Sequence, residues 1–258
     1  MPQKLGQHFL ISAPILERIS QAVCPDPAGT VIEIGPGRGA LTEKLLHRAQ
    51  HVIAIEIDRS LIESLRSRFA GHSGLEVLHA DVLDVDLAQW GRVPIAGNLP
   101  YYITSPILEK ALRAGSPRSV FLLQKEVAER LTAKPGTREY GYLTAQTALF
   151  SDVRRLFDVK PGAFRPPPRV DSSVVLIEPH SRNFGIQDRD AFLQFLSHCF
   201  RQKRKTLRNN LVGVYGKEII DQWPEASLRA EQLPIETLAG LFRRVETIPA
   251  PENPTPAY

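Results

Sequence analysis

The segment Asn98-Leu99-Pro100-Tyr101 combines an amide side chain, a proline and an aromatic ring. This combination suits methylation of the exocyclic amine of a nucleic-acid base, whose lone pair is delocalised into the base. The Asn98 side-chain oxygen and the Pro100 carbonyl accept hydrogen bonds from the amine and orient its nitrogen. Tyr101 stacks on the flipped base, and most of the catalysis is positioning. On its own, the segment also fits a proline-terminated strand with packed tyrosines.

A glycine-rich turn, residues 33–40, connects an apolar run to a helical pattern. Gly35 and Gly37 allow tight backbone geometry and let amide groups approach a ligand closely. Glu56 follows 21 residues after Gly35, at the end of the next apolar run, where a carboxylate accepts hydrogen bonds from a ribose diol. Asp58 competes for this task. These features fit a nicotinamide dinucleotide as well as S-adenosylmethionine.

Three further side chains distinguish the two cofactors. Glu33 precedes the glycines, and its carboxylate suits an ammonium group but opposes a pyrophosphate. Asp81 follows the third apolar run, where it accepts a hydrogen bond from the adenine amine, and Asn98 ends the fourth. Since open parallel sheets bind ligands at the carboxyl ends of their strands, these residues predict an S-adenosylmethionine site.

Phe164 is a second candidate for stacking on the target base. It lies in residues 160–170, a loop whose prolines restrict the backbone. An aromatic ring on a stiff loop closes one face of a base pocket while Tyr101 closes the other. The alternative is that Phe164 anchors this loop to the core.

The order of elements predicts an α/β fold with a Rossmann-like sheet. Short β-branched runs alternate with helical patterns from residue 30 to residue 179, as in parallel βαβ units. The expected strands are residues 30–34, 51–56, 75–79, 93–97 and 119–123. The expected helices are residues 40–48, 60–70, 106–114, 125–132 and 142–150. Residues 153–159 and 172–177 follow as two strands without a helix between them, which indicates an antiparallel hairpin.

The pattern becomes purely helical in the C-terminal part. Residues 190–200, 203–215 and 235–245 carry apolar side chains at helical spacing. We therefore expect a cofactor-binding catalytic domain over residues 1–182 and a small all-α domain over residues 183–248. The proline-rich residues 249–258 are expected to form a disordered tail.

A basic cluster opens the second expected helix of the small domain and contains no acidic residue. Clustered lysine and arginine side chains supply salt-sensitive contacts to phosphates, which predicts RNA binding. The alternative is an ordinary solvated helix face. Four arginines of the catalytic domain, Arg154, Arg155, Arg165 and Arg169, extend the cluster if they share its face. The members of the cluster are Arg201, Lys203, Arg204, Lys205 and Arg208.

Composition narrows the class of protein. The chain has 258 residues, 43% of them hydrophobic, and a net charge of +4, as in a mildly basic globular protein. No apolar stretch is long enough to span a membrane, and the first ten residues do not form a signal peptide. The two cysteines and scattered histidines do not fit a disulfide framework or a metal site. We expect a cytoplasmic protein without a metal ion.

With these residues, the chain resembles the ribosomal RNA adenine N6,N6-dimethyltransferase family, and within it the bacterial 16S rRNA enzymes. The matching segments run collinearly from about residue 4 to about residue 241. They are residues 6–10, 33–42, 56–58, 81–83, 98–103, 124–128, 165–172 and 204–208.

The resemblance implies that S-adenosylmethionine is held by a set of residues spread over these segments. This set is His8, Leu10, Gly35, Glu56, Asp81 and Asn98. His8 stands where the family often has asparagine, so only a backbone or generic polar contact is carried over. Tyr102 likewise replaces a frequent asparagine just past the motif.

The resemblance also implies a reaction and a substrate. The family methylates N6 of two adjacent adenosines in the 3′-terminal hairpin of 16S rRNA, in the small ribosomal subunit or its precursor, and contributes to ribosome biogenesis. We expect a monomer. Three alternatives stay open: a non-catalytic RNA-binding or ribosome-assembly factor, a nicotinamide-dependent oxidoreductase, and an enzyme that acts on large-subunit rRNA.

Overall fold

A computed structural model describes residues 8–99 and 103–246, and these residues form two compact units. The first unit is Met1–Glu129 with Ser151–His180, and the second is Arg130–Phe150 with Ser181–Tyr258. The predicted boundary near residue 182 lies close to a point where the chain passes from the first unit to the second, between His180 and Ser181. Residues 130–150, however, belong with the C-terminal helices and not with the first unit. The predicted tail lies outside the described residues.

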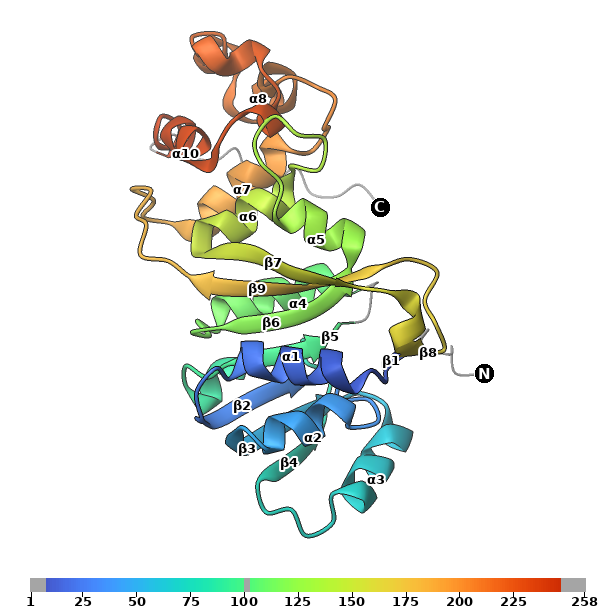
Figure 1. The fold of residues 1–258 in the computed structure, drawn as a ribbon. Helices are drawn as coiled ribbons and strands as arrows, with labels where there is room; N and C mark the ends of the chain where they lie inside the picture. The colour runs from blue at the N-terminus through green and yellow to red at the C-terminus, as the bar shows by residue number, and fades with distance from the viewer. Residues whose placement is uncertain (1–7, 100–102, 247–258) are drawn as a thin grey trace, which may run out of the picture. The chain divides into compact units, whose positions relative to one another are not determined.

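The first unit is built on a seven-stranded sheet with the order β4-β3-β2-β5-β6-β9-β7 (Figure 1). Five neighbouring strands are parallel, and β9 and β7 are antiparallel, which confirms the predicted parallel units and the closing hairpin. The strands are β2 (Ala28–Ile34), β3 (Ala49–Glu56), β4 (Leu75–His79), β5 (Ile95–Asn98), β6 (Ser119–Gln124), β7 (Ser151–Val159) and β9 (Ser172–Pro179).

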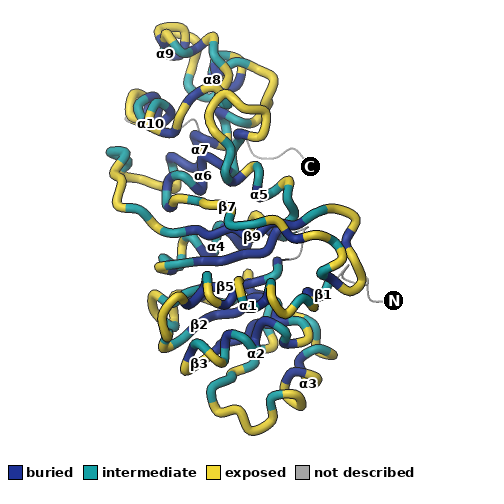
Figure 2. The backbone as a smooth tube through the Cα atoms, in the orientation of Figure 1, coloured by how far each residue is buried: buried dark blue, intermediate teal, exposed yellow. Residues whose placement is uncertain are grey.

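The register of the parallel strands aligns their carboxyl ends at one edge of the sheet. Ile34 of β2 pairs with Ile55 of β3 and with Gly97 of β5. Glu56 and Asn98 therefore follow at the same level, one residue later on each strand. The apolar residues of the strands are buried in the sheet (Figure 2). Because their packing holds the strands in this register, it also sets where Glu56 and Asn98 lie at the strand ends.

Helices cover both faces of this sheet. α1 (Ala13–Val23) and α2 (Ala40–Leu46) pack on one face, and α4 (Thr104–Arg113) lies on the other (Figure 1). Further helices of this part of the chain are α3 (Arg59–Arg68), the short 3-10 helix η1 (Leu87–Trp90) and α5 (Lys125–Leu131). α1 was not predicted from the sequence, although its buried residues Leu16, Ile19 and Val23 have helical spacing and Pro14 suits a first turn.

A two-stranded ribbon, also not predicted, joins the N-terminal segment to the proline-rich loop. β1 (Phe9–Leu10) pairs antiparallel with β8 (Phe164–Arg165), with Phe9 opposite Arg165 and Leu10 opposite Phe164. The Ile11 amide extends the ribbon by donating to the carbonyl of Ala163 at 2.8 Å, at the end of the 3-10 helix η2 (Pro161–Ala163).

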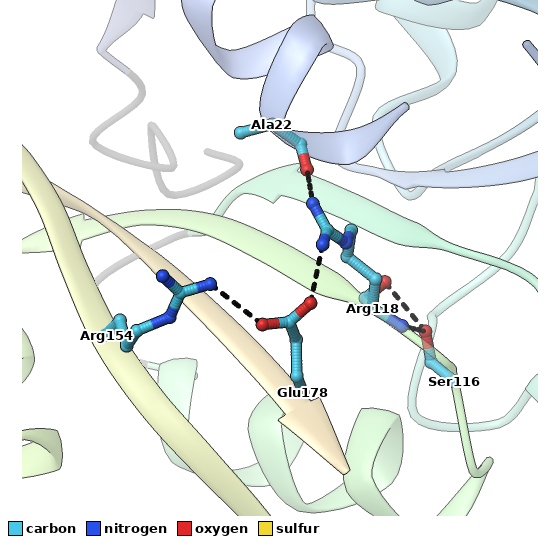
Figure 3. Close-up of polar contacts among 5 residues, drawn as sticks. All are labelled: Ala22, Ser116, Arg118, Arg154 and Glu178. Atoms are coloured by element: carbon cyan, nitrogen blue, oxygen red, sulfur yellow. Dashed lines mark hydrogen bonds and ion pairs between the residues drawn. The ribbon is translucent and has the colours of Figure 1, made fainter. Parts of the chain in front are cut away.

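A polar network stabilises the opposite edge of the sheet, away from the strands' carboxyl ends (Figure 3). Glu178 of β9 accepts from Arg118, just before β6, at 2.6 Å and from Arg154 of β7 at 3.0 Å. Arg118 also donates to the Ala22 carbonyl of α1 at 3.0 Å. One carboxylate thus connects three strands and a helix, and Arg154 is a structural residue here.

The regular secondary structure of the second unit is helical throughout its described residues. Its core contains Phe192, Phe195 and Phe242, with ring centroids 5.3 Å apart between Phe192 and Phe242 and 5.5 Å apart between Phe195 and Phe242. Leu149 is buried in the same core, which explains why residues 130–150 belong to this unit. Its helices are α6 (Tyr142–Phe150), α7 (Arg189–Cys199), α8 (Leu207–Tyr215), α9 (Lys217–Ile220), η3 (Pro224–Ser227), η4 (Ala230–Gln232) and α10 (Ile235–Arg243).

The start of α8 corrects one prediction. The helix expected over residues 203–215 begins at Leu207, because Thr206 is its N-cap and its hydroxyl accepts from the Asn209 amide at 3.3 Å. Residues 201–205 therefore form a turn before the helix. Over residues 8–99 and 103–246, no helix has the length and apolar character that crossing a membrane requires.

Candidate active site

A cavity of about 740 Å³ opens at the carboxyl ends of β2, β3 and β5. This volume is within the range of small-molecule and cofactor sites. The cavity brings together all eight residues that were predicted to hold the cofactor. They are His8, Leu10, Glu33, Gly35, Gly37, Glu56, Asp81 and Asn98.

Glu56 is held by backbone amides on two sides. Its Oε1 accepts from the amides of Ile57 and Asp58, each at 3.0 Å, and its Oε2 accepts from the Gly37 amide at 3.1 Å. Burial raises the pKa of Glu56, and the amide hydrogen bonds oppose that shift. The carboxylate therefore fixes the glycine turn to the end of β3 and still borders the cavity. Asp58 instead caps α3 by accepting from the Ser60 amide.

Glu33 is the most deeply buried carboxyl group of the cavity, with 1% of its surface exposed. Its Oε2 accepts from the Thr42 hydroxyl of α2 at 2.6 Å. Burial raises the pKa of Glu33 to about 7; the negative charge of Glu56 adds to this effect and the Thr42 hydrogen bond opposes it. A cationic group in the cavity would favour the ionised form of this side chain.

The glycine turn requires glycine at position 37 for two reasons. Gly37 has a φ of 59°, which L side chains rarely adopt, and a Cβ atom there would lie 3.1 Å from two carbon atoms of the Phe9 ring. Phe9 therefore packs directly on the turn. The Arg38 guanidinium also lies over the Phe9 ring, 4.6 Å from its centroid.

Asp81 and its neighbours form the end of the cavity near β3 and β4. The Asp81 Oδ1 accepts from the Leu83 amide at 2.9 Å, which holds the carboxylate in place after β4. Ile57 and Val82 line the cavity close by, and Ile57 is 51% exposed. Apolar side chains beside a fixed carboxylate can accommodate a flat aromatic group that carries a hydrogen-bond donor.

Asn98 is oriented by the N-terminal segment. Its Nδ2 donates to the His8 carbonyl at 2.9 Å, and a His8 ring nitrogen, Nδ1, lies 2.9 Å from the Pro166 carbonyl. With the amide nitrogen engaged, the Asn98 oxygen is the acceptor that this side chain presents. Sequence reasoning had no signal for this role of the His8 carbonyl. Pro100 and Tyr101, predicted to act with Asn98, lie outside the described residues.

Phe164 lies in the core, as expected from the alternative interpretation in which it anchors the proline-rich loop. Its side chain is 3% exposed and packs in the core of the first unit with Leu10, and it is not among the described residues that line the cavity. The next residue, Arg165, lines the cavity instead. Stacking of Phe164 on a base stays a prediction, and it requires the ring to leave the core.

The basic cluster of the second unit is only partly available for RNA. Arg208 forms a two-pronged ion pair with Asp221 at 2.6 and 3.2 Å, and this partner raises the pKa of Arg208. Lys203 donates to the Arg138 carbonyl and lies 3.7 Å from Glu231. The other three members, Arg201, Arg204 and Lys205, are exposed and have no ion pair with any described residue.

Asn210, which was not predicted as a site residue, stabilises the basic turn of residues 201–205 through hydrogen bonds to the backbone. Its Nδ2 donates to the carbonyls of Cys199 and Gln202 at 2.9 and 3.2 Å, and its Oδ1 accepts from the Gln202 amide at 3.2 Å. The available signal in the sequence was an asparagine two positions after a basic run.

Comparison with known protein families identifies the family of this chain. The family model described as ribosomal RNA adenine dimethylase matches residues 2–244. The chain belongs to the ribosomal RNA adenine dimethylase family. The predicted family and the predicted rRNA adenine dimethyltransferase activity class are thereby confirmed, and the nicotinamide-dependent oxidoreductase alternative is wrong.

Two curated members of the family show how far the similarity extends. The ribosomal RNA small subunit methyltransferase A of Acidobacterium capsulatum is 45% identical, over 94% of this chain and 90% of its own. The protein of the same name from Chlorobium luteolum is 42% identical, over 98% of this chain and 92% of its own.

Two solved structures share the fold and exceed 25% sequence identity. A dimethyladenosine transferase from Plasmodium falciparum is 28% identical with a TM-score of 0.77, covering 93% of this chain and 98% of its own. The 23S rRNA methyltransferase ErmE is 26% identical with a TM-score of 0.69, covering 92% of this chain and 99% of its own. The predicted methyltransferase fold is therefore confirmed.

Proposed function

We propose that this chain transfers methyl groups from S-adenosylmethionine to N6 of two adjacent adenosines in the 3′-terminal hairpin of 16S rRNA. The observation that carries the proposal is the convergence of Glu33, Glu56 and Asn98 on one cavity at the carboxyl edge of the sheet. Family membership supplies the chemical class, and the side chains of this cavity supply the groups that such a transfer needs.

The residues present fit S-adenosylmethionine, which when bound supplies an activated methyl group on a sulfonium. Glu33 suits the ligand's ammonium, because a buried carboxyl group gains a counter-ion there. Glu56 suits the ribose diol, and Asp81 beside Ile57 suits the adenine ring and its amine. Leu10 and the glycine turn at Gly35 and Gly37 complete the walls.

Asn98 is the catalytic residue of this proposal. Its oxygen accepts a hydrogen bond from the target amine and so aligns the nitrogen lone pair for in-line attack. Pro100 contributes its carbonyl and Tyr101 its ring to the same base, as the sequence predicts. The proton that the methylated amine loses needs no strong base, because the ammonium product is acidic.

The choice of small-subunit rRNA follows the curated relatives. Proteins named for small-subunit methylation are 40–45% identical to this chain, whereas the 23S rRNA methyltransferase ErmE is 26% identical. In this proposal a monomer acts on the small subunit or its precursor during ribosome biogenesis. Arg201, Arg204 and Lys205 contact RNA phosphates, with Lys203 and Arg208 positioned beside them.

Labelled S-adenosylmethionine tests the proposal on undermethylated small ribosomal subunits. We expect label in adenosine with the wild-type chain and about 100-fold less or lower with Asn98→Ala, while calorimetry shows cofactor binding by the wild type. Cofactor binding without any transfer to small subunits would contradict the proposal and favour a non-catalytic assembly factor. If large subunits are labelled in a parallel reaction and small subunits are not, the proposed substrate is wrong.

A further inference from the structure

Charge is unevenly distributed in the cavity of the first unit, and Glu43 of α2, which also lines it, pairs with Arg68. The carboxyl groups of Glu33, Glu56 and Asp81 lie at the strand ends that form its floor. Cationic side chains line the same cavity from the glycine turn, from two helices and from the ribbon. These cations are Arg38, Lys44, Arg68 and Arg165.

Two of these cations are exposed and have no acidic partner. Arg68 is engaged, because it pairs with Glu43 and donates to the Arg38 carbonyl at 2.7 Å. The side chains of Arg38 and Arg165 are exposed, and neither makes a hydrogen bond or ion pair with any residue in the described ranges. Most other arginines of the described first unit have such a partner, as Arg118 does with Glu178.

The two arginines flank one aromatic ring. The Arg38 guanidinium lies 4.6 Å from the centroid of Phe9, and Phe9 is directly opposite Arg165 in the β1–β8 ribbon. Residues directly opposite each other in an antiparallel pair project from the same face. Two positive side chains thus border a single ring at the cavity, and neither is paired with a carboxylate of the described residues, which favours a bound anion.

We propose that Arg38 and Arg165 bind the phosphodiester backbone next to the target adenosine and so position that nucleotide. This inference rests on the proposed function, which requires a base to be flipped into the cavity. A flipped base brings its own phosphates to the rim of the pocket. Guanidinium groups match phosphate geometry and donate two parallel hydrogen bonds, so two arginines suffice to hold the strand.

The test compares Arg165→Gln, Arg38→Gln and the double variant with the wild type on undermethylated small subunits. For each single variant we expect KM for the subunit to rise about threefold to tenfold. The slope of log affinity against log salt should become shallower by about 0.7–0.9 for each lost phosphate contact. The dissociation constant for S-adenosylmethionine, measured by calorimetry, should stay within twofold.

Arg113→Gln is the matched control, because Arg113 is 46% exposed, pairs with Glu109, and ends α4 at the opposite edge of the sheet. It should not change KM or the salt slope. Wild-type KM and salt slope in the Arg38 and Arg165 variants would overturn the inference while leaving the proposed function intact. If the wild type transfers no methyl group, the salt slope of subunit binding decides the inference by itself.

Discussion

Glu33 connects the geometry of the cavity to pH. Its carboxyl group is buried beside Thr42, and burial raises its pKa to about 7, so a proton is retained well above the usual range for glutamate. The other acidic groups that line the cavity are Glu43, which pairs with Arg68, Glu56 and Asp81, and burial also raises the pKa of Glu56. An ammonium group in this cavity binds best once Glu33 has lost its proton.

Binding of S-adenosylmethionine should therefore strengthen as the pH rises from 6 to 8. Below pH 7 the ligand must displace a proton from Glu33, which weakens binding by up to about tenfold per pH unit. Calorimetry at several pH values measures this. Glu33→Gln should bind weakly at every pH, and a pH dependence equal to that of the wild type would contradict the assignment.

The same group predicts the opposite trend for stability without ligand. A carboxyl group whose pKa is raised on folding favours the folded state below pH 4.5, and this contribution is lost as the pH rises through 7. The stability of Glu33→Gln relative to wild type should therefore increase between pH 6 and pH 8 by roughly 1–1.5 kcal/mol, which is the part of the loss that falls in this pH range. Thermal unfolding of both proteins at each pH measures the difference.

Asn98 should be required for the methyl-transfer step more than for folding. Asn98→Ala removes the acceptor for the target amine and the donor to the His8 carbonyl, and we expect single-turnover transfer to fall about 100-fold or more. Asn98→Asp retains an oxygen but places it against the His8 carbonyl, so it should not restore the rate. Wild-type turnover in Asn98→Asp would show that the orientation set by His8 is unimportant.

At the scale of elements, the β1–β8 ribbon links the N-terminal segment, the glycine turn and the proline-rich loop. Phe164 is its buried member, so Phe164→Ala should destabilise the protein by about 3–5 kcal/mol in denaturant unfolding. Phe164→Leu retains most apolar contacts and should cost roughly 1–2 kcal/mol.

The turnover of Phe164→Leu separates the two roles considered for this residue. If the ring only anchors the loop, as its burial indicates, the folded leucine variant should retain most of its activity. A stable leucine variant with a large loss of turnover would instead assign Phe164 to base stacking.

The basic turn of the second unit depends on Asn210. Asn210→Ala removes three hydrogen bonds to Cys199 and Gln202 and should destabilise the protein by about 1–3 kcal/mol. Because the turn carries Arg201, Arg204 and Lys205, affinity for small subunits should also fall, measured by filter binding. Unchanged affinity in the folded variant would show that the turn does not contact RNA.

At the scale of the whole molecule, net charge says little about the partner. A charge of +4 fits many globular proteins. What matters is which cations are already neutralised: Arg208 by Asp221, and Arg154 by Glu178, in contrast to exposed Arg201 and Arg165. Sequence shows a basic run, but only the fold shows which members have acidic partners.

The sequence predicted the elements whose signal is periodic or continuous. The apolar strands and the acids at their ends were identifiable because a parallel sheet buries both faces. The β1–β8 ribbon was not, since two-residue strands have no periodicity. The pairing of Arg208 with Asp221 and the bond from Asn98 to His8 join residues 13 and 90 positions apart in the chain, and no local pattern indicates either.

The most direct test of the account is to map the methylated nucleotides after incubating wild-type protein, S-adenosylmethionine and undermethylated small subunits. Mass spectrometry of nuclease fragments should place two methyl groups on N6 of each of two adjacent adenosines in the 3′-terminal hairpin of 16S rRNA. Methylation at another atom, at another site, or only in large-subunit rRNA would contradict it.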